Sequence, residues 1–200
     1  MKEKLKIGID LDDVVFEFMK TLVNYYNEKT RSNFLYEEMN SYKISDTLKI
    51  NHEEVDDIIK EMIEKNKNLD MAVCEFAKES ILNLSKNKEI YFITSRVHRK
   101  NTLESLQKHF SDINFELFFS SNPYVNNEGK HKGEICLDLN IDYMIEDSYE
   151  HAINCANSGV KCFLIDKPWN KNRGEHEKII RVKNWKDILE KLEEFENVNG

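Results

Sequence analysis

The chain has 200 residues, of which 29 are Lys or Arg and 37 are Asp or Glu, so its formal net charge is −8. Hydrophobic residues make up 40% of the sequence, which is enough for a packed core and too much for a disordered chain. No apolar run approaches the roughly 18–20 residues of a membrane span. Binding to a nucleic-acid polymer depends on Lys and Arg neutralising phosphates, and the net acidity argues against it. We therefore expect a globular protein with neither a membrane nor a nucleic-acid partner; its oligomeric state is left open.

Cysteine usage indicates a reducing compartment. The four cysteines are Cys74, Cys136, Cys155 and Cys162, and none forms a CxxC pair or has a histidine at zinc-finger spacing. Free thiols are typical of the cytoplasm, so we expect a cytoplasmic protein.

Apolar runs alternate with amphipathic helices along most of the chain. Five runs predict buried strands, at 5–12, 89–95, 115–121, 143–147 and 161–166. Helices are expected at about 99–109, near 133–139, from 149 to Gly159, and around 185–195. This alternation is typical of an α/β fold in which helices cover both faces of a parallel sheet.

Residues 16–75 interrupt that alternation with helices and no strong strand. Asn51 and Glu54 have the spacing of a capping box, and the apolar residues of 55–63 recur at helical spacing. We interpret 16–75 as a helical cap inserted after the first strand, with 1–15 and 76–200 forming the core.

Acidic and hydroxyl side chains follow the predicted strands. In open α/β sheets the site lies beyond the carboxyl ends of the strands, so these groups should meet at one edge. Crowded carboxylates repel one another unless a cation joins them, and oxygen ligands suit Mg²⁺. Mg²⁺ with lysine and hydroxyl donors in turn suits a phosphoryl group. The segments concerned are Asp10-Leu11-Asp12-Asp13, Thr94-Ser95-Arg96, Lys130 to Lys132, and Glu146-Asp147.

The spacing of Asp10 and Asp12 has a chemical meaning of its own. In an extended segment, residues i and i+2 point to the same side, so both carboxylates can face one phosphorus. Asp10 could then attack phosphorus and form an aspartyl-phosphate. Asp12 could protonate the leaving oxygen and afterwards activate the water that hydrolyses the intermediate.

Four segments together resemble the motifs of the haloacid dehalogenase (HAD) superfamily. They are Asp10-Leu11-Asp12-Asp13-Val14, Tyr91-Phe92-Ile93-Thr94-Ser95, Lys132, and Ile145-Glu146-Asp147-Ser148, in the order of motifs I to IV. Lys132-Gly133-Glu134-Ile135-Cys136 and Asp166-Lys167-Pro168-Trp169-Asn170 resemble the 5′(3′)-deoxyribonucleotidase-like branch. The resemblance implies a HAD-like Rossmannoid three-layer core with strand order 5-4-1-2-3 and a cap that covers the substrate.

The resemblance also implies roles for these residues. Asp10 is the expected nucleophile and a Mg²⁺ ligand, while Asp12 is the acid/base and binds the metal through its backbone carbonyl. Thr94, Ser95 and Lys132 are expected to bind phosphate, with Lys130 as the alternative lysine. Asp147 should bind the metal directly, and Glu146 through water.

The expected activity is Mg²⁺-dependent phosphomonoester hydrolysis, with a nucleoside or deoxynucleoside monophosphate as substrate. Phe16 and Phe18 are candidates to stack on a nucleobase and Arg96 is a candidate substrate contact, whereas Trp169 is read as packing. The alternatives are a HAD phosphatase for a sugar phosphate or another small phosphometabolite, and a catalytically silent HAD binding module. The second is disfavoured because Asp10, Asp12, Thr94, Lys132 and Asp147 are all present.

Overall fold

The computed structural model describes residues 4–121 and 129–199, and a parallel sheet lies at its centre. The strand order is β3-β2-β1-β4-β5-β6, and every neighbouring pair is parallel. The strands are β1 (Lys6–Ile9), β2 (Glu89–Thr94), β3 (Phe115–Phe119), β4 (Tyr143–Glu146), β5 (Lys161–Ile165) and β6 (Ile179–Val182). The expected α/β class and the order of the first five strands are confirmed. β6 was missed, because four residues within a polar stretch give too little pattern to identify a strand.

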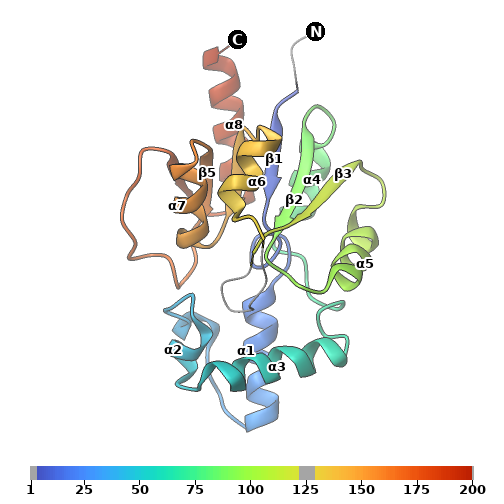
Figure 1. Ribbon diagram of the computed structural model, residues 1–200, viewed down its shortest axis with the longest axis vertical. Coiled ribbons are helices and arrows are strands. Elements are labelled where there is room, and N and C mark those ends of the chain that lie inside the picture. Colours follow the sequence, from blue (N-terminus) through green and yellow to red (C-terminus); the bar gives the residue numbers. More distant parts are fainter. Residues whose placement is uncertain (1–3, 122–128, 200) are drawn as a thin grey trace.

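Helices cover both faces of this sheet (Figure 1). On one face pack α4 (Ala77–Leu84), α5 (Arg99–Phe110) and α8 (Trp185–Asn199), and on the other α6 (Lys132–Leu139) and α7 (Tyr149–Asn157). Alternate strand residues face the two clusters, as Phe92 and Tyr91 of β2 do. The architecture is therefore three-layered.

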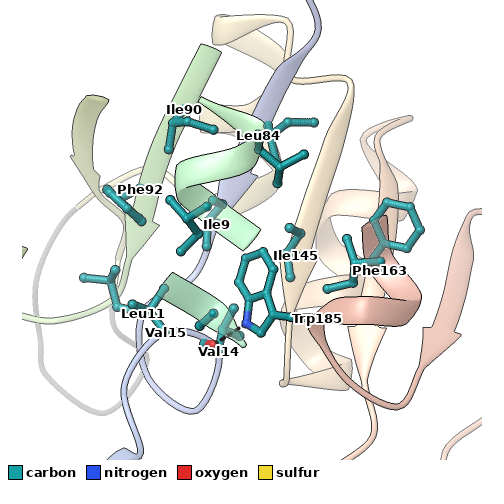
Figure 2. Close-up of a cluster of buried hydrophobic side chains, with 14 of the residues drawn as sticks. Ile9, Leu11, Val14, Val15, Leu84, Ile90, Phe92, Ile145, Phe163 and Trp185 are labelled. Carbon is teal, nitrogen blue, oxygen red and sulfur yellow. Dashed lines mark hydrogen bonds between the residues drawn. The ribbon is translucent and has the colours of Figure 1, made fainter. Parts of the chain in front are cut away.

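The core beneath the first face also fixes the loop after β1. Ile9, Leu11, Val14 and Val15 are fully buried around Trp185 (Figure 2). The indole Nε1 of Trp185 donates a hydrogen bond of 2.9 Å to the carbonyl oxygen of Val14. The C-terminal helix thus holds the segment in which the first acidic motif lies.

The helices between β1 and α4 form a separate lobe (Figure 1). They are α1 (Phe18–Thr30), the short 3-10 helix η1 (Tyr36–Glu38), α2 (Ile44–Leu48) and α3 (His52–Glu64), and a cluster of their own apolar side chains packs them together. The capping box of α3 is confirmed: Glu54 N donates to Asn51 Oδ1 and Asn51 N donates to Glu54 Oε2, both at 2.9 Å. None of the helices described is long and apolar enough to span a membrane.

Candidate active site

The site forms where β1, β2 and β4 end. Parallel pairing places Ile9 beside Phe92 on one side and Ile145 on the other, and Asp10 N donates to the carbonyl oxygen of Ile145 at 3.0 Å. The residues that follow these strands therefore share one edge of the sheet, as the sequence predicts.

Lys132 is at the centre of this edge. Its Nζ lies 2.6 Å from Asp10 Oδ1 and 2.6 Å from Glu146 Oε1, and the whole residue is 2% exposed. Burial opposes its charge, but the two carboxylates outweigh burial and raise the pKa of Lys132. Lys130, the alternative lysine, is exposed and pairs with Asp138 instead. The geometry therefore favours Lys132 over Lys130 as the lysine of the site.

Three buried carboxylates lie around Lys132. Asp10, Glu146 and Asp147 each offer an oxygen within 4.8 Å of the others. Burial, and then the charge of Asp10, raises the pKa of Asp147 to about 7, and burial also raises the pKa values of Asp10 and Glu146. Three carboxylates against one ammonium leave an excess of negative charge at low dielectric, which a hard divalent cation would offset. This donor set fits Mg²⁺.

Asp12 points to a different partner. Arg96 Nε lies 3.0 and 3.1 Å from its two carboxylate oxygens, and Arg96 Nη2 lies 2.6 Å from Oδ1. Both side chains are only partly exposed, so the pair is held in place at the edge of the site. Arg96, a candidate substrate contact, thus binds Asp12 in this structure.

Two hydroxyl residues, Thr94 and Ser95, lie at the end of β2 and directly after it. Thr94 is fully buried, and its Oγ1 accepts a hydrogen bond of 3.2 Å from Arg96 N. Ser95 Oγ lies 2.8 Å from Ser120 Oγ, which links the end of β2 to the end of β3.

A cavity of about 240 Å³ separates this edge from the helical lobe. Asp12, Asp147 and Arg96 line it from the core, and Phe18 and residues of α3 line it from the lobe. Phe16 does not: it is 1% exposed, and its ring packs against Arg96 and His109. Phe16, a candidate to stack on a nucleobase, therefore lies in the core and not in the cavity wall, and its backbone bridges to Asp12 and Val73.

Trp169 and Asn170 both donate hydrogen bonds to Asp147, contacts that the sequence did not predict. The indole Nε1 of Trp169 donates a hydrogen bond of 2.9 Å to Asp147 Oδ2. Asn170 Nδ2 donates one of 2.7 Å to the backbone carbonyl oxygen of Asp147. Trp169 also packs in the core of the helical lobe, as expected, so one residue links that lobe to the acid. The Asp166–Asn170 stretch resembles the deoxyribonucleotidase-like branch, but the sequence does not indicate that Trp169 and Asn170 contact Asp147.

Asp13 also has a role that the sequence did not reveal. It adopts a left-handed φ of 59°, and its carboxylate oxygens accept hydrogen bonds of 3.0 and 3.1 Å from Met19 N. It thus caps the first turn of α1 and fixes the direction in which the chain leaves the sheet.

Tyr42 of the lobe and His151 of α7 meet above the acids, with ring centroids 6.0 Å apart. Burial and then the nearby carboxylates, Asp147 first, raise the pKa of Tyr42. Burial, assisted by Lys132 and His131, lowers the pKa of His151 to about 3. Ser148 caps α7 by accepting a hydrogen bond from His151 N. The N-cap of this helix is therefore Ser148, and the neighbouring Asp147 belongs to the acidic cluster.

Comparison with known proteins identifies the family. The model of the family described as 5′ nucleotidase, deoxy (pyrimidine), cytosolic type C matches residues 4–193. The chain belongs to this family. A nucleotidase of Clostridium acetobutylicum is 26% identical over 189 residues, covering 93% of this chain and 92% of the relative. As a member of this nucleotidase family, the protein is a phosphoric monoester hydrolase.

Solved structures share the HAD fold. A haloacid dehalogenase-like hydrolase of Streptococcus pneumoniae superposes with a TM-score of 0.68 at 10% identity, covering 96% of this chain and 100% of that one. A HAD hydrolase of Bacillus subtilis bound to magnesium superposes with a TM-score of 0.61 at 14% identity, covering 96% and 99%. The expected HAD-like architecture of this nucleotidase family member is confirmed.

Proposed function

We propose that this nucleotidase family member hydrolyses nucleoside monophosphates, with Mg²⁺ as cofactor and an aspartyl-phosphate on Asp10 as intermediate. One observation carries the proposal. The buried ammonium of Lys132 lies between Asp10 and Glu146, with Asp147 beside them, at the edge where β1 and β4 end. A nucleophilic carboxylate, a fixed cation and a set of oxygen ligands are what phosphoryl transfer to an aspartate requires.

Asp10, Asp147 and the backbone carbonyl of Asp12 would hold the magnesium ion, with Glu146 acting through water. Once bound, the ion would offset phosphate charge as phosphorus is attacked. Trp169 would keep Asp147 oriented through its hydrogen bond, as groups behind metal ligands commonly do. Lys132 would screen Asp10 from the phosphoryl oxygens, and the hydroxyls of Thr94 and Ser95 would donate to them.

The reaction then takes two steps. A carboxylate oxygen of Asp10 forms a bond to phosphorus while the bond from phosphorus to the ester oxygen breaks, and Asp12 gives its proton to that oxygen. Asp12 next takes a proton from water, whose oxygen attacks the aspartyl-phosphate. This restores Asp10 and releases inorganic phosphate. Arg96 keeps the Asp12 carboxyl group at the edge of the cavity, where an ester oxygen would enter.

The family match and the named nucleotidase relative support a nucleotide substrate, and we propose residues 16–75 as the cap that selects it. The cavity between that lobe and the acids has room for the organic part of the ester. The free thiols support a cytoplasmic location.

Phosphate release with Mg²⁺ tests the proposal across ribo- and deoxyribonucleoside monophosphates and common sugar phosphates. Asp10→Asn should abolish release, and Asp12→Asn should lower it by about 10²–10⁴-fold, the usual contribution of proton transfer. Asp57, exposed on α3, offers the control Asp57→Asn, which should match the wild type. Full activity in Asp10→Asn would refute the nucleophile, and preference for a sugar phosphate would refute the substrate.

A further inference from the structure

Asn68 has a buried acceptor without a partner in the wall of the active-site cavity. The residue lies in the turn after α3, is 8% exposed and lines the cavity. Among the residues that the structure describes, none donates a hydrogen bond to its Oδ1. Buried side-chain oxygens in native proteins nearly always have a donor, so water or a bound ligand must supply the donor to this atom.

Other buried polar residues of the same cavity are satisfied. Asp13 accepts from Met19 N, and Asp147 accepts from Trp169. Thr102 Oγ1 donates to the carbonyl oxygen of His98 at 2.9 Å. The acceptor of Asn68 is therefore distinguished from these neighbours by having no partner.

The surroundings of Asn68 restrict what can donate to it. Ile59, Met62, Met71 and Phe18 line the same cavity, so a group that enters must present apolar faces to them. It must also carry an N–H or O–H for Asn68. A nucleobase meets both demands, because it has two flat apolar faces for these side chains and an edge with N–H donors for Asn68.

The turn is held to both lobes, which makes Asn68 a fixed contact. Lys67 N donates to the carbonyl oxygen of Met62 at 2.9 Å. From the core, Lys108 Nζ on α5 donates to the carbonyl oxygen of Leu69 at 3.1 Å. A preorganised acceptor of this kind discriminates better than a mobile one.

We propose that Asn68 Oδ1 accepts a hydrogen bond from an N–H of the substrate's nucleobase, and so selects nucleotides over phosphate esters without a base. Asp12 and Asp147 line the same cavity, so the phosphate of such a ligand would lie at the acids and its base at Asn68. The inference rests on the proposed function and names the residue that determines the substrate class.

Asn68→Leu tests it, because leucine has a similar volume and no acceptor. We expect kcat/KM for uridine 5′-monophosphate to fall about 10- to 100-fold, the range typical of losing one buried hydrogen-bond partner. Ribose 5-phosphate, which lacks the base, should be hydrolysed as by the wild type. Asn24, exposed on α1 in the same lobe, supplies the control Asn24→Leu, which should leave both substrates unchanged.

Unchanged kcat/KM for the nucleotide in Asn68→Leu would overturn the inference and leave the proposed function standing. An equal fall on both substrates would also overturn it, since that result indicates a structural role. Calorimetric binding of uridine, which has a base and no phosphate, separates Asn68 from catalysis. The wild type should bind it at least tenfold more tightly than Asn68→Leu. Equal dissociation constants would overturn the inference even if the wild type released no phosphate.

Discussion

Replacing Lys132 by methionine tests how the charges of the site are balanced. The change keeps an unbranched chain and removes the ammonium that lies 2.6 Å from both Asp10 and Glu146. Those carboxylates are 5% and 0% exposed, so water cannot take the place of the lost charge. Breaking a buried ion pair from one side costs about 3–5 kcal/mol, and we expect a loss of that size in the free energy of unfolding at pH 7 without metal.

The loss should depend on pH with a definite sign. Burial raises the pKa values of Asp10 and Glu146 above their ordinary values of 3.8 and 4.5, and the charge of Lys132 lowers them again in part. Without the ammonium, both pKa values should therefore rise further. A carboxyl group whose pKa is raised in the folded state binds its proton more tightly there. Its contribution to stability is greatest below the unfolded pKa and is lost as pH rises through the folded pKa. The deficit of Lys132→Met relative to the wild type should therefore grow from pH 5 to pH 8.

Urea denaturation at these pH values, with and without Mg²⁺, measures the effect. Added Mg²⁺ should recover part of the deficit, because it binds the carboxylates that the variant leaves unpaired. Lys130→Met is the matched control, since Lys130 is exposed and its partner Asp138 can be hydrated instead; it should change stability little. Equal deficits in the two variants, or a deficit that shrinks as pH rises, would refute the charge balance described above.

Two further variants test the surroundings of the site. Trp169→Phe removes the donor to Asp147 and should raise the Mg²⁺ concentration for half-maximal activity by about 10–100-fold. Trp185→Phe is the control: it loses the hydrogen bond to the Val14 carbonyl oxygen and should leave this Mg²⁺ concentration unchanged. The same shift in both variants would contradict the role of Trp169 in orienting Asp147. The depressed pKa of His151, about 3 against 6.5 when unfolded, means that the unfolded chain binds the extra proton. The contribution of His151 to stability should therefore fall as pH drops below 6.5, by up to about 2 kcal/mol at pH 5. In urea denaturation, His151→Gln should lose less stability than the wild type between pH 6.5 and pH 5. Parallel stability–pH profiles of the two proteins would refute the depressed pKa of His151.

The sheet and the edge at which its acids lie could be predicted from the amino-acid pattern alone. Strands buried on both faces are largely apolar, and the apolar runs in β1, β2 and β4 predict where these strands end. Because parallel strands end at the same edge, Asp10, Thr94 and Asp147 could be brought together without coordinates. The capping box of α3 was equally local, since both partners lie within one turn. β6 was missed because its four residues are too few to show a pattern.

Which side-chain atoms contact one another depends on the folded chain. Lys130 and Lys132 are two residues apart in the sequence, yet one faces solvent and the other lies between two buried carboxylates. Phe16 and Phe18 both follow the first acidic motif, but the first is in the core and the second lines the cavity. Contacts such as Trp169 with Asp147 join residues 22 positions apart, and no periodic pattern encodes them. Hydrophobic periodicity reports which face of an element is buried; partner identity depends on the packing of separate elements, which exists only in the folded chain.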